Sequence, residues 1–159
     1  MNKFVVVILL IAAGILVYMF MGNTAAVTAQ GANLGEWTMD LEAAKLLAKD
    51  MDVPLMLKFT GSDWCGWCKI MEKDVFSKSE FLDYAGTHLV LVTIDSPRDK
   101  SIVPEEYWQR NQQLFKQYGV RGVPTYVILD ANGKEIGRLG AGRGKTPASF
   151  IAELKGITG

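Results

Sequence analysis

The sequence has few of the residues that build metal centres and disulfide scaffolds. Its 159 residues include two cysteines and one histidine, His88. Two cysteines close together cannot form a disulfide framework. With one distant histidine they also supply too few ligands for a structural zinc site, which needs about four. We therefore expect no metal and no cofactor, and we expect the two cysteines to carry chemistry.

Net charge is also absent. Lys and Arg together number 17, Asp and Glu together number 17, and no long run of like charge occurs. Without a global electrostatic field, the chain is not expected to bind nucleic acid. The length allows one domain with a substantial core, and no internal repeat is visible.

The N-terminal segment is a long stretch without a charged residue. After Lys3, residues 4–21 are apolar, just enough to span a bilayer, which takes about 20 residues. The run exceeds the apolar core of about 7–15 residues in a cleaved signal peptide, yet small residues precede a possible cleavage point after Ala29. A signal peptide and a retained signal anchor over residues 1–21 both stay open. Either one places the remainder on the outer side of the membrane, because the positive charge stays inside.

Composition then changes along the chain. Residues 22–33 are rich in Ala, Thr and Gly and predict a linker. The folded domain is expected to occupy residues 34–159. If the N-terminal segment is retained, the membrane itself is a partner of the protein.

Apolar periodicity predicts alternating strands and helices in the domain. Strand-like runs lie at 54–59, 89–95, 125–130 and 135–139. Helix-like runs lie at about 40–50, 68–75, 81–85, 105–118 and from 147 onward. Asn132-Gly133 predicts a tight hairpin between the last two strands. This order predicts an α/β fold with a central mixed sheet flanked by helices.

Two helix starts are marked by capping residues. Thr38 is a candidate N-cap of the first helix, and Thr146 is a candidate N-cap of the last helix. Pro147 follows at the first helical position, where proline is favoured. The last helix is therefore expected to begin at residue 147.

Both cysteines lie in one stretch, Trp64-Cys65-Gly66-Trp67-Cys68-Lys69, between a predicted strand and a predicted helix. This order places Cys65 at or near a helix N-terminus, where free amide groups and the helix dipole favour negative charge. Such a setting lowers the pKa of a cysteine from about 8.5 to roughly 3.5–7.5, and the thiolate is the species that attacks a disulfide. Cys68, one turn later, can resolve the mixed disulfide. The motif predicts a dithiol–disulfide exchanger with Cys65 and Cys68 as catalytic residues.

The cysteine motif, together with Gly122-Val123-Pro124-Thr125 before a strand, resembles the two signatures of the thioredoxin superfamily. The resemblance covers roughly residues 34–157. It is strongest to the exported, thioredoxin-like proteins of bacterial envelopes that carry Gly-Ser-Asp-Trp-Cys-Gly-Trp-Cys. It implies a thioredoxin-like fold and a thiol–disulfide oxidoreductase in the periplasm or anchored to the cytoplasmic membrane. It also implies Cys65 as the attacking thiol, Cys68 as the resolving thiol and Pro124 as a cis proline facing them.

The same residues suggest how a substrate is held. A proline at a strand start does not donate to the sheet, and Val123 beside it is expected to offer backbone groups to an extended substrate segment. Aromatic side chains suit flat contacts with partner proteins, although Trp64 could equally serve packing. The predicted substrate-binding residues are Trp64, Gly66, Trp67, Val123 and Pro124.

Two positions depart from thioredoxin. Gly66-Trp67 stands where thioredoxin has Gly-Pro, so the direction of electron flow stays open. Lys58 falls where thioredoxin has a buried acid that helps to deprotonate the resolving cysteine. Lys58 either favours the thiolate from a buried position or, as we expect, forms the solvent end of a half-buried strand. Asp63 and Glu72 are nearby acids that could relay protons.

Protein disulfides or dithiols are the expected substrates, and reduction is the direction we favour. Because the space outside the cytoplasm is oxidising, a reductase there needs an electron donor in the membrane. The alternative is a non-catalytic docking module of the envelope, in which Cys65→Ser would leave function intact. The glycine-rich stretch at 140–146 lacks the spacing of a phosphate-binding loop and is expected to form a turn.

Overall fold

The computed structural model describes residues 31–159 of the chain. The predictions for residues 1–21, and those for residues 22–30 of the expected linker, lie outside this part. Within it, Ala32 is already buried in the core, and Leu34 forms an isolated bridge with Val90. No helix in residues 31–159 is both long enough and apolar enough to cross a membrane.

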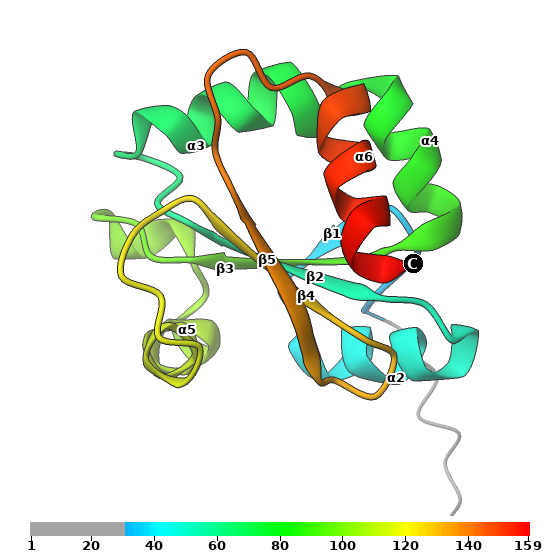
Figure 1. Ribbon diagram of the computed structural model, residues 1–159. Helices are drawn as coiled ribbons and strands as arrows, with labels where there is room; N and C mark the ends of the chain where they lie inside the picture. Colours follow the sequence, from blue (N-terminus) through cyan, green and yellow to red (C-terminus); the bar gives the residue numbers. More distant parts are fainter. Residues whose placement is uncertain (1–30) are drawn as a thin grey trace, which may run out of the picture. The chain divides into compact units, whose positions relative to one another are not determined.

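A five-stranded mixed sheet forms the centre of the domain (Figure 1). In the spatial order β1-β3-β2-β4-β5, its strands are β1 (Trp37–Thr38), β3 (Val90–Asp95), β2 (Leu55–Thr60), β4 (Thr125–Leu129) and β5 (Glu135–Gly140). β1 and β2 run parallel to β3, whereas β4 is antiparallel to β2 and to β5. The predicted mixed sheet is confirmed. The strand β1 was not predicted, because a pair of residues is too short to show a periodic pattern.

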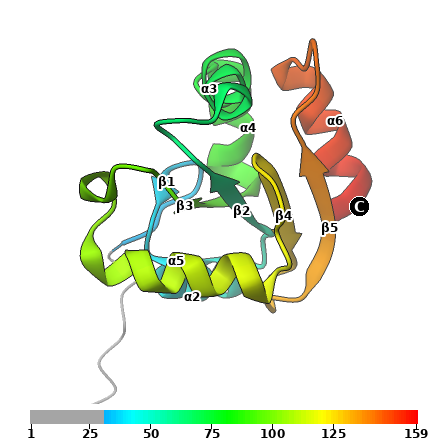
Figure 2. The same ribbon diagram turned by 90° about the vertical axis from the view of Figure 1, so that its left-hand side faces the viewer.

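Helices cover both faces of this sheet. They are α2 (Leu41–Met51), α3 (Gly66–Met71), the π-helix η1 (Glu72–Phe76), α4 (Ser79–His88), the 3-10 turn η2 (Lys100–Ile102), α5 (Glu105–Gln117) and α6 (Pro147–Thr158). In both views α2 and α5 lie on one side of the sheet, and α3, α4 and α6 lie on the other (Figures 1 and 2). The helix-flanked α/β architecture predicted from the sequence is therefore confirmed.

The first helix has a different cap from the predicted one. Asp40 is the N-cap of α2, and its carboxylate accepts the Ala43 amide N–H at 3.0 Å. Thr38 belongs to β1 and instead accepts the Asp40 amide N–H at 3.0 Å. Thr146 does cap α6, in a reciprocal capping box with Ser149.

The central strand β2 is buried along its whole length. One face of β2 joins an aliphatic core under α2 and α5, with the side chains of Leu55, Leu57 and Phe59. The other face joins an aromatic core that includes Phe76, Phe81, Tyr126 and Phe150. The carboxyl end of this buried strand leads directly into the cysteine motif.

Candidate active site

A tight turn carries the chain from the end of β2 into α3. The Gly61 carbonyl accepts the amide N–H groups of Trp64 at 3.2 Å and Cys65 at 2.8 Å. A Cβ on Gly61 would lie 2.3 Å from the indole of Trp64, so the position of this indole against the turn requires glycine. The turn places Cys65 as the N-cap residue of α3. This agrees with the predicted position at or near a helix N-terminus.

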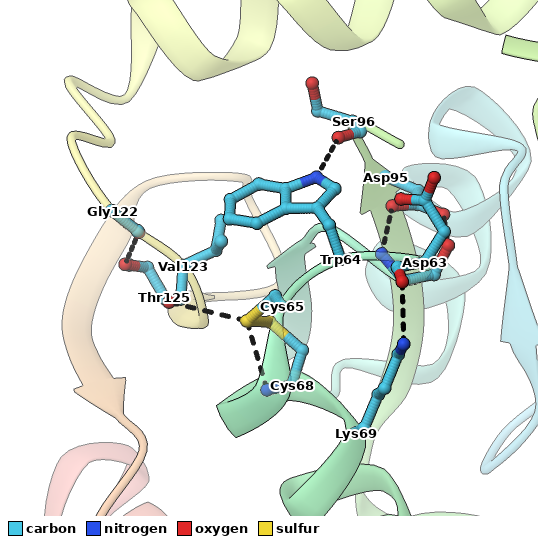
Figure 3. Close-up of a disulfide and its surroundings, with 11 residues drawn as sticks. Asp63, Trp64, Cys65, Cys68, Lys69, Asp95, Ser96, Gly122, Val123 and Thr125 are labelled. Atoms are coloured by element: carbon cyan, nitrogen blue, oxygen red, sulfur yellow. Dashed lines mark hydrogen bonds between the residues drawn. A yellow bond between two sulfur atoms is a disulfide. The ribbon is translucent and has the colours of Figure 1, made fainter. Parts of the chain in front are cut away.

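Cys65 and Cys68 form a disulfide with Cα atoms 5.2 Å apart (Figure 3). The Sγ atom of Cys65 accepts the Cys68 amide N–H at 3.1 Å and lies 3.7 Å from the carbonyl oxygen of Val123. In the disulfide this sulfur has no proton, so the second distance is a contact rather than a hydrogen bond. When the pair is reduced, the amide groups of the helix N-terminus can stabilise a thiolate on Cys65.

The second motif lies against the first. The peptide bond between Val123 and Pro124 is cis, and the Val123 carbonyl faces Cys65, which is 58 positions earlier in the chain. Among residues 31–159, no hydrogen bond engages the Val123 amide N–H. A half-buried backbone donor and acceptor are therefore available beside the disulfide.

The two sulfurs are much less exposed than the residues around them. Cys65 is 5% exposed and Cys68 is 7% exposed, whereas Trp64 is 43% and Trp67 is 45% exposed. Gly66, between the cysteines, is also exposed. A partner sulfur must reach the pair through the opening that these residues border.

The cysteine turn is fixed to the segment that follows β3. The buried carboxylate of Asp95 accepts the Ser62 amide N–H at 3.0 Å and the Ser62 hydroxyl at 2.5 Å. The indole N–H of Trp64 donates to the Ser96 carbonyl at 3.0 Å (Figure 3). Trp64 therefore has a packing role against the loop, and its indole remains exposed to a partner. In the sequence, Asp95 is marked only as a polar residue at the end of an apolar run.

Asp63 adds a further attachment. Its carboxylate accepts the backbone N–H groups of Arg98 and Asp99, each at 3.0 Å. The hydrogen bond from Asp99 is the main reason why the pKa of Asp63 lies below its usual range. A carboxylate stabilised in its charged form is a poor proton relay. Asp63 therefore fixes the loop at Arg98 and Asp99 to the cysteine turn.

Lys58 does not lie where the sequence suggested. The expectation of a solvent-exposed strand end is wrong, because β2 is the central strand and Lys58 is 8% exposed. Its Nζ donates to the Glu72 carboxylate at 2.8 Å and lies 3.6 Å from the centroid of the Trp37 ring. Burial is the largest influence on the amine and lowers the pKa of Lys58, while Glu72 acts in the opposite direction.

A cavity of about 450 Å³ is lined by Cys68 and by this ion pair. Its lining residues are Lys58, Thr60, Ser62, Cys68, Lys69, Glu72, Lys73, Ser77 and Thr93. Apart from Cys68, every one of them has a polar or charged side chain. The Glu72 side chain is about half exposed, at 51%, so its carboxylate lies between this cavity and solvent. The spacing of four residues between Cys68 and Glu72 on a helix could have indicated their proximity.

Within the part of the chain that the structure describes, no metal ligand set accompanies the dithiol. His88 ends α4 and stacks on Tyr84, with ring centroids 4.5 Å apart. Over the described range 31–159, no three His, Cys, Asp or Glu side chains gather closely enough to hold a metal ion. The reactive groups that the fold brings together are the two sulfurs, backbone amides and the Lys58–Glu72 pair.

This fold and this site define a family. The family model of the thioredoxin-like domain matches residues 41–157, and the chain belongs to that family. It is 42% identical over 124 residues to the disulfide bond reductase DsbH of Chlamydia pneumoniae. These residues are 78% of this chain and 72% of that protein.

A solved structure and a further relative support the same family. A solved structure of a DsbH oxidoreductase has a TM-score of 0.72 at 38% identity, covering 86% of this chain and 90% of that chain. The thiol:disulfide interchange protein DsbD of Photorhabdus laumondii is 34% identical over 98 residues, which are 60% of this chain but 15% of that protein. Together with the Cys65–Cys68 pair, these matches confirm the predicted thioredoxin-like fold and the predicted class, a thiol–disulfide oxidoreductase.

Proposed function

We propose that this protein reduces disulfide bonds of other proteins outside the cytoplasm, with Cys65 as the attacking thiol and Cys68 as the resolving thiol. One observation carries the proposal: Sγ of Cys65 lies 3.1 Å from a helix N-terminal amide and 3.7 Å from the Val123 carbonyl. One sulfur is thus placed where negative charge is stabilised. It is also placed beside backbone groups that an extended substrate can pair with.

The reaction begins with the reduced protein. The Cys65 thiolate attacks one sulfur of the substrate disulfide, and the other substrate sulfur leaves as a thiolate and takes up a proton. Cys68 then loses its proton and attacks the Cys65 sulfur, which releases the second substrate thiol. The protein is left with the Cys65–Cys68 disulfide, and two electrons have passed to the substrate.

The Lys58–Glu72 pair assists the second step. Cys68 shares a cavity with both residues, and the Lys58 ammonium favours a thiolate there by its positive charge. Glu72 lines the same cavity and is half exposed, at 51%, so its carboxylate can pass the Cys68 proton to solvent. The lysine at the position of thioredoxin's buried acid thereby acts through charge rather than as a base.

Substrate binding is assigned to Trp64, Gly66, Trp67, Val123 and Pro124. The exposed indoles of Trp64 and Trp67, at 43% and 45%, support a contact with the partner protein. The amide N–H of Val123, which no hydrogen bond engages within residues 31–159, supports main-chain pairing with an extended segment, which depends little on the partner's sequence. One enzyme could then serve several protein disulfides.

The location outside the cytoplasm is supported by the uncharged apolar run at 4–21 and by the single nearby positive side chain, Lys3. Each catalytic cycle leaves the protein oxidised, so it requires an electron donor in the membrane, since the surrounding compartment is oxidising. Mass spectrometry of the mature protein distinguishes a cleaved signal peptide from a retained anchor by its N-terminal residue.

Single-cysteine variants test the reaction. With reduced protein and a protein disulfide substrate, Cys65→Ser should lower the rate to that of the uncatalysed reaction. Cys68→Ser should accumulate a mixed disulfide between Cys65 and the substrate, visible on a non-reducing gel. Ser79→Ala, an exposed small change on α4, is the matched control and should retain full activity. A Cys65→Ser variant that keeps its cellular function would instead favour the docking module.

The direction of electron flow is tested by the reduction potential of the Cys65–Cys68 pair, measured by equilibration with glutathione. A reductase should have a potential closer to about −270 mV, typical of thioredoxin, than to about −120 mV, typical of a strong oxidant. A value at the oxidising end would contradict the proposed direction and leave the exchange chemistry intact.

A further inference from the structure

We propose that the substrate groove selects disulfides flanked by acidic residues, and that Arg143 recognises this charge. The inference rests on the proposed function, because it concerns the protein segment that carries the disulfide to Cys65. It gives a role to the glycine-rich stretch at 140–146, which the sequence marked only as a turn.

The groove is a hollow of about 380 Å³ beside the disulfide. Its lining residues are Trp67, Val123, Pro124, Gly140, Ala141, Gly142 and Arg143. The β4–β5 register sets Gly140 opposite Thr125, and a Cβ on Gly140 would lie 4.0 Å from the Pro124 carbonyl oxygen. The loop after β5 is thereby brought next to the strand start that faces Cys65. A segment paired with Val123 would pass along this loop.

Arg143 is the single charged residue among those that line the groove, and no acidic residue lines it. Its side chain is exposed, and within residues 31–159 it takes part in no ion pair. Arg121, two positions before Val123, is exposed and likewise without an ion pair in this part of the chain. The side of the site that receives the substrate therefore carries uncompensated positive charge.

The loop that presents Arg143 is held in place. Lys145 donates to the Gly140 carbonyl at 2.9 Å and to the Glu153 carboxylate at 2.7 Å. Thr146 immediately after it caps α6. The charge of Lys145 is thus paired with Glu153, and its side chain connects the loop to α6. The charge of Arg143 can therefore interact with a ligand. The guanidinium fork matches a carboxylate with two parallel hydrogen bonds.

A partner segment with Asp or Glu beside its cysteine would place a carboxylate against this arginine while its backbone pairs with Val123. Such a contact lies at a partly solvated rim, so its effect on the rate is moderate. We expect an acidic peptide to react about three- to tenfold faster than a basic one. The preference should shrink as salt is added, because exposed charges are screened.

The experiment uses the reduced full-length protein and two short synthetic peptides, each closed by a Cys–Cys disulfide. The peptides are identical except that one carries Glu and the other Lys on both sides of the first cysteine. The measured quantity is the ratio of their kcat/KM values. The variants are Arg143→Gln and Arg143→Glu. Lys49→Glu, on the exposed surface of α2, is a control with the same net charge change as Arg143→Glu.

The proposal expects the wild-type protein and Lys49→Glu to favour the Glu peptide equally. Arg143→Gln should bring the ratio close to one, and Arg143→Glu should reverse it. A wild-type ratio near one, or a preference that both Arg143 variants keep, would overturn the inference. Failure of the proposed function has a different signature: the wild-type protein would then reduce neither peptide nor uncharged bis(2-hydroxyethyl) disulfide, and the inference would fall with it.

Discussion

The two faces of β2 differ in composition, although the same six residues supply both. Toward α2 and α5 the strand presents Leu55, Leu57 and Phe59, and their neighbours in that core are apolar. Toward the opposite helices it presents Met56, then Lys58 and Thr60, and the last two line the cavity that contains Cys68. Hydrophobic packing therefore occupies one face, and polar groups gather on the other face at the end nearest the dithiol.

Lys58 illustrates how a buried charge is tolerated in the middle of a sheet. An unpaired ammonium in an apolar interior is strongly unfavourable. Lys58 has both an ion pair with Glu72 at 2.8 Å and the face of the Trp37 ring at 3.6 Å, and a cation over an aromatic ring is stabilised. The polar face thus retains a charge beside Cys68 at a cost to stability that the apolar face offsets.

The largest expected effect lies on the apolar face. Phe59→Ala removes a fully buried ring that packs against Phe115 and Tyr118, with centroids 5.0 and 5.8 Å apart. We expect a loss of about 3–5 kcal/mol in the free energy of unfolding, measured by urea denaturation. Leu46→Ala, at an exposed position, is the control and should change little. If Phe59→Ala also shifted the potential of the disulfide strongly, the division between the two faces would not hold.

The next effect lies on the polar face. Glu72→Gln leaves the buried Lys58 ammonium with a neutral partner, and we expect a loss of about 1–3 kcal/mol in stability. The same change should slow the attack of Cys68 on a preformed mixed disulfide, followed by stopped-flow release of a chromogenic thiol. Glu80→Gln, exposed on α4, is the matched control. An unchanged release rate in Glu72→Gln would remove the ion pair from the proposed mechanism.

The smallest change at neutral pH is expected for Lys58→Met, since a buried ion pair is often replaced by an apolar side chain at little cost. Its signature is the pH dependence of the stability difference. Burial lowers the pKa of Lys58 below 10.5 in the folded protein, so the unfolded chain binds more protons between the two pKa values. Stability of the wild type relative to Lys58→Met should therefore rise with pH through that window and level off above 10.5. A flat or falling difference would contradict a buried amine.

Local sequence patterns predicted much of the fold. Apolar strand-like runs identified β2, β3 and β4, and the capping pattern at Thr146 identified the start of α6. The sequence patterns gave a wrong prediction where a residue type suits two different structural roles. Thr38 resembled a helix cap but pairs in β1, because Asp40 lies closer to the helix and caps it. A short strand such as β1 exists through its pairing with β3 and has no pattern of its own.

Some features of the candidate site were likewise predicted from local sequence, and others were not. The strand before the cysteines and the helix-like run after them predicted Cys65 at or near a helix N-terminus, and the structure makes it the N-cap of α3. The groups that shape its surroundings, Asp95, Trp37 and the loop with Arg143, come from distant parts of the chain. Their roles depend on pairing across the sheet, which a single sequence does not reveal.

The thiol chemistry can be predicted from the sequence, because a short motif contains both sulfurs and local helix geometry indicates where negative charge is stabilised. The environment of the two sulfurs depends on the three-dimensional fold. A lysine on a central strand is exposed or buried according to what covers its face of the sheet, and here Trp37, Glu72 and Phe76 lie over Lys58. The burial of Lys58, on which its proposed effect on Cys68 depends, follows from that arrangement.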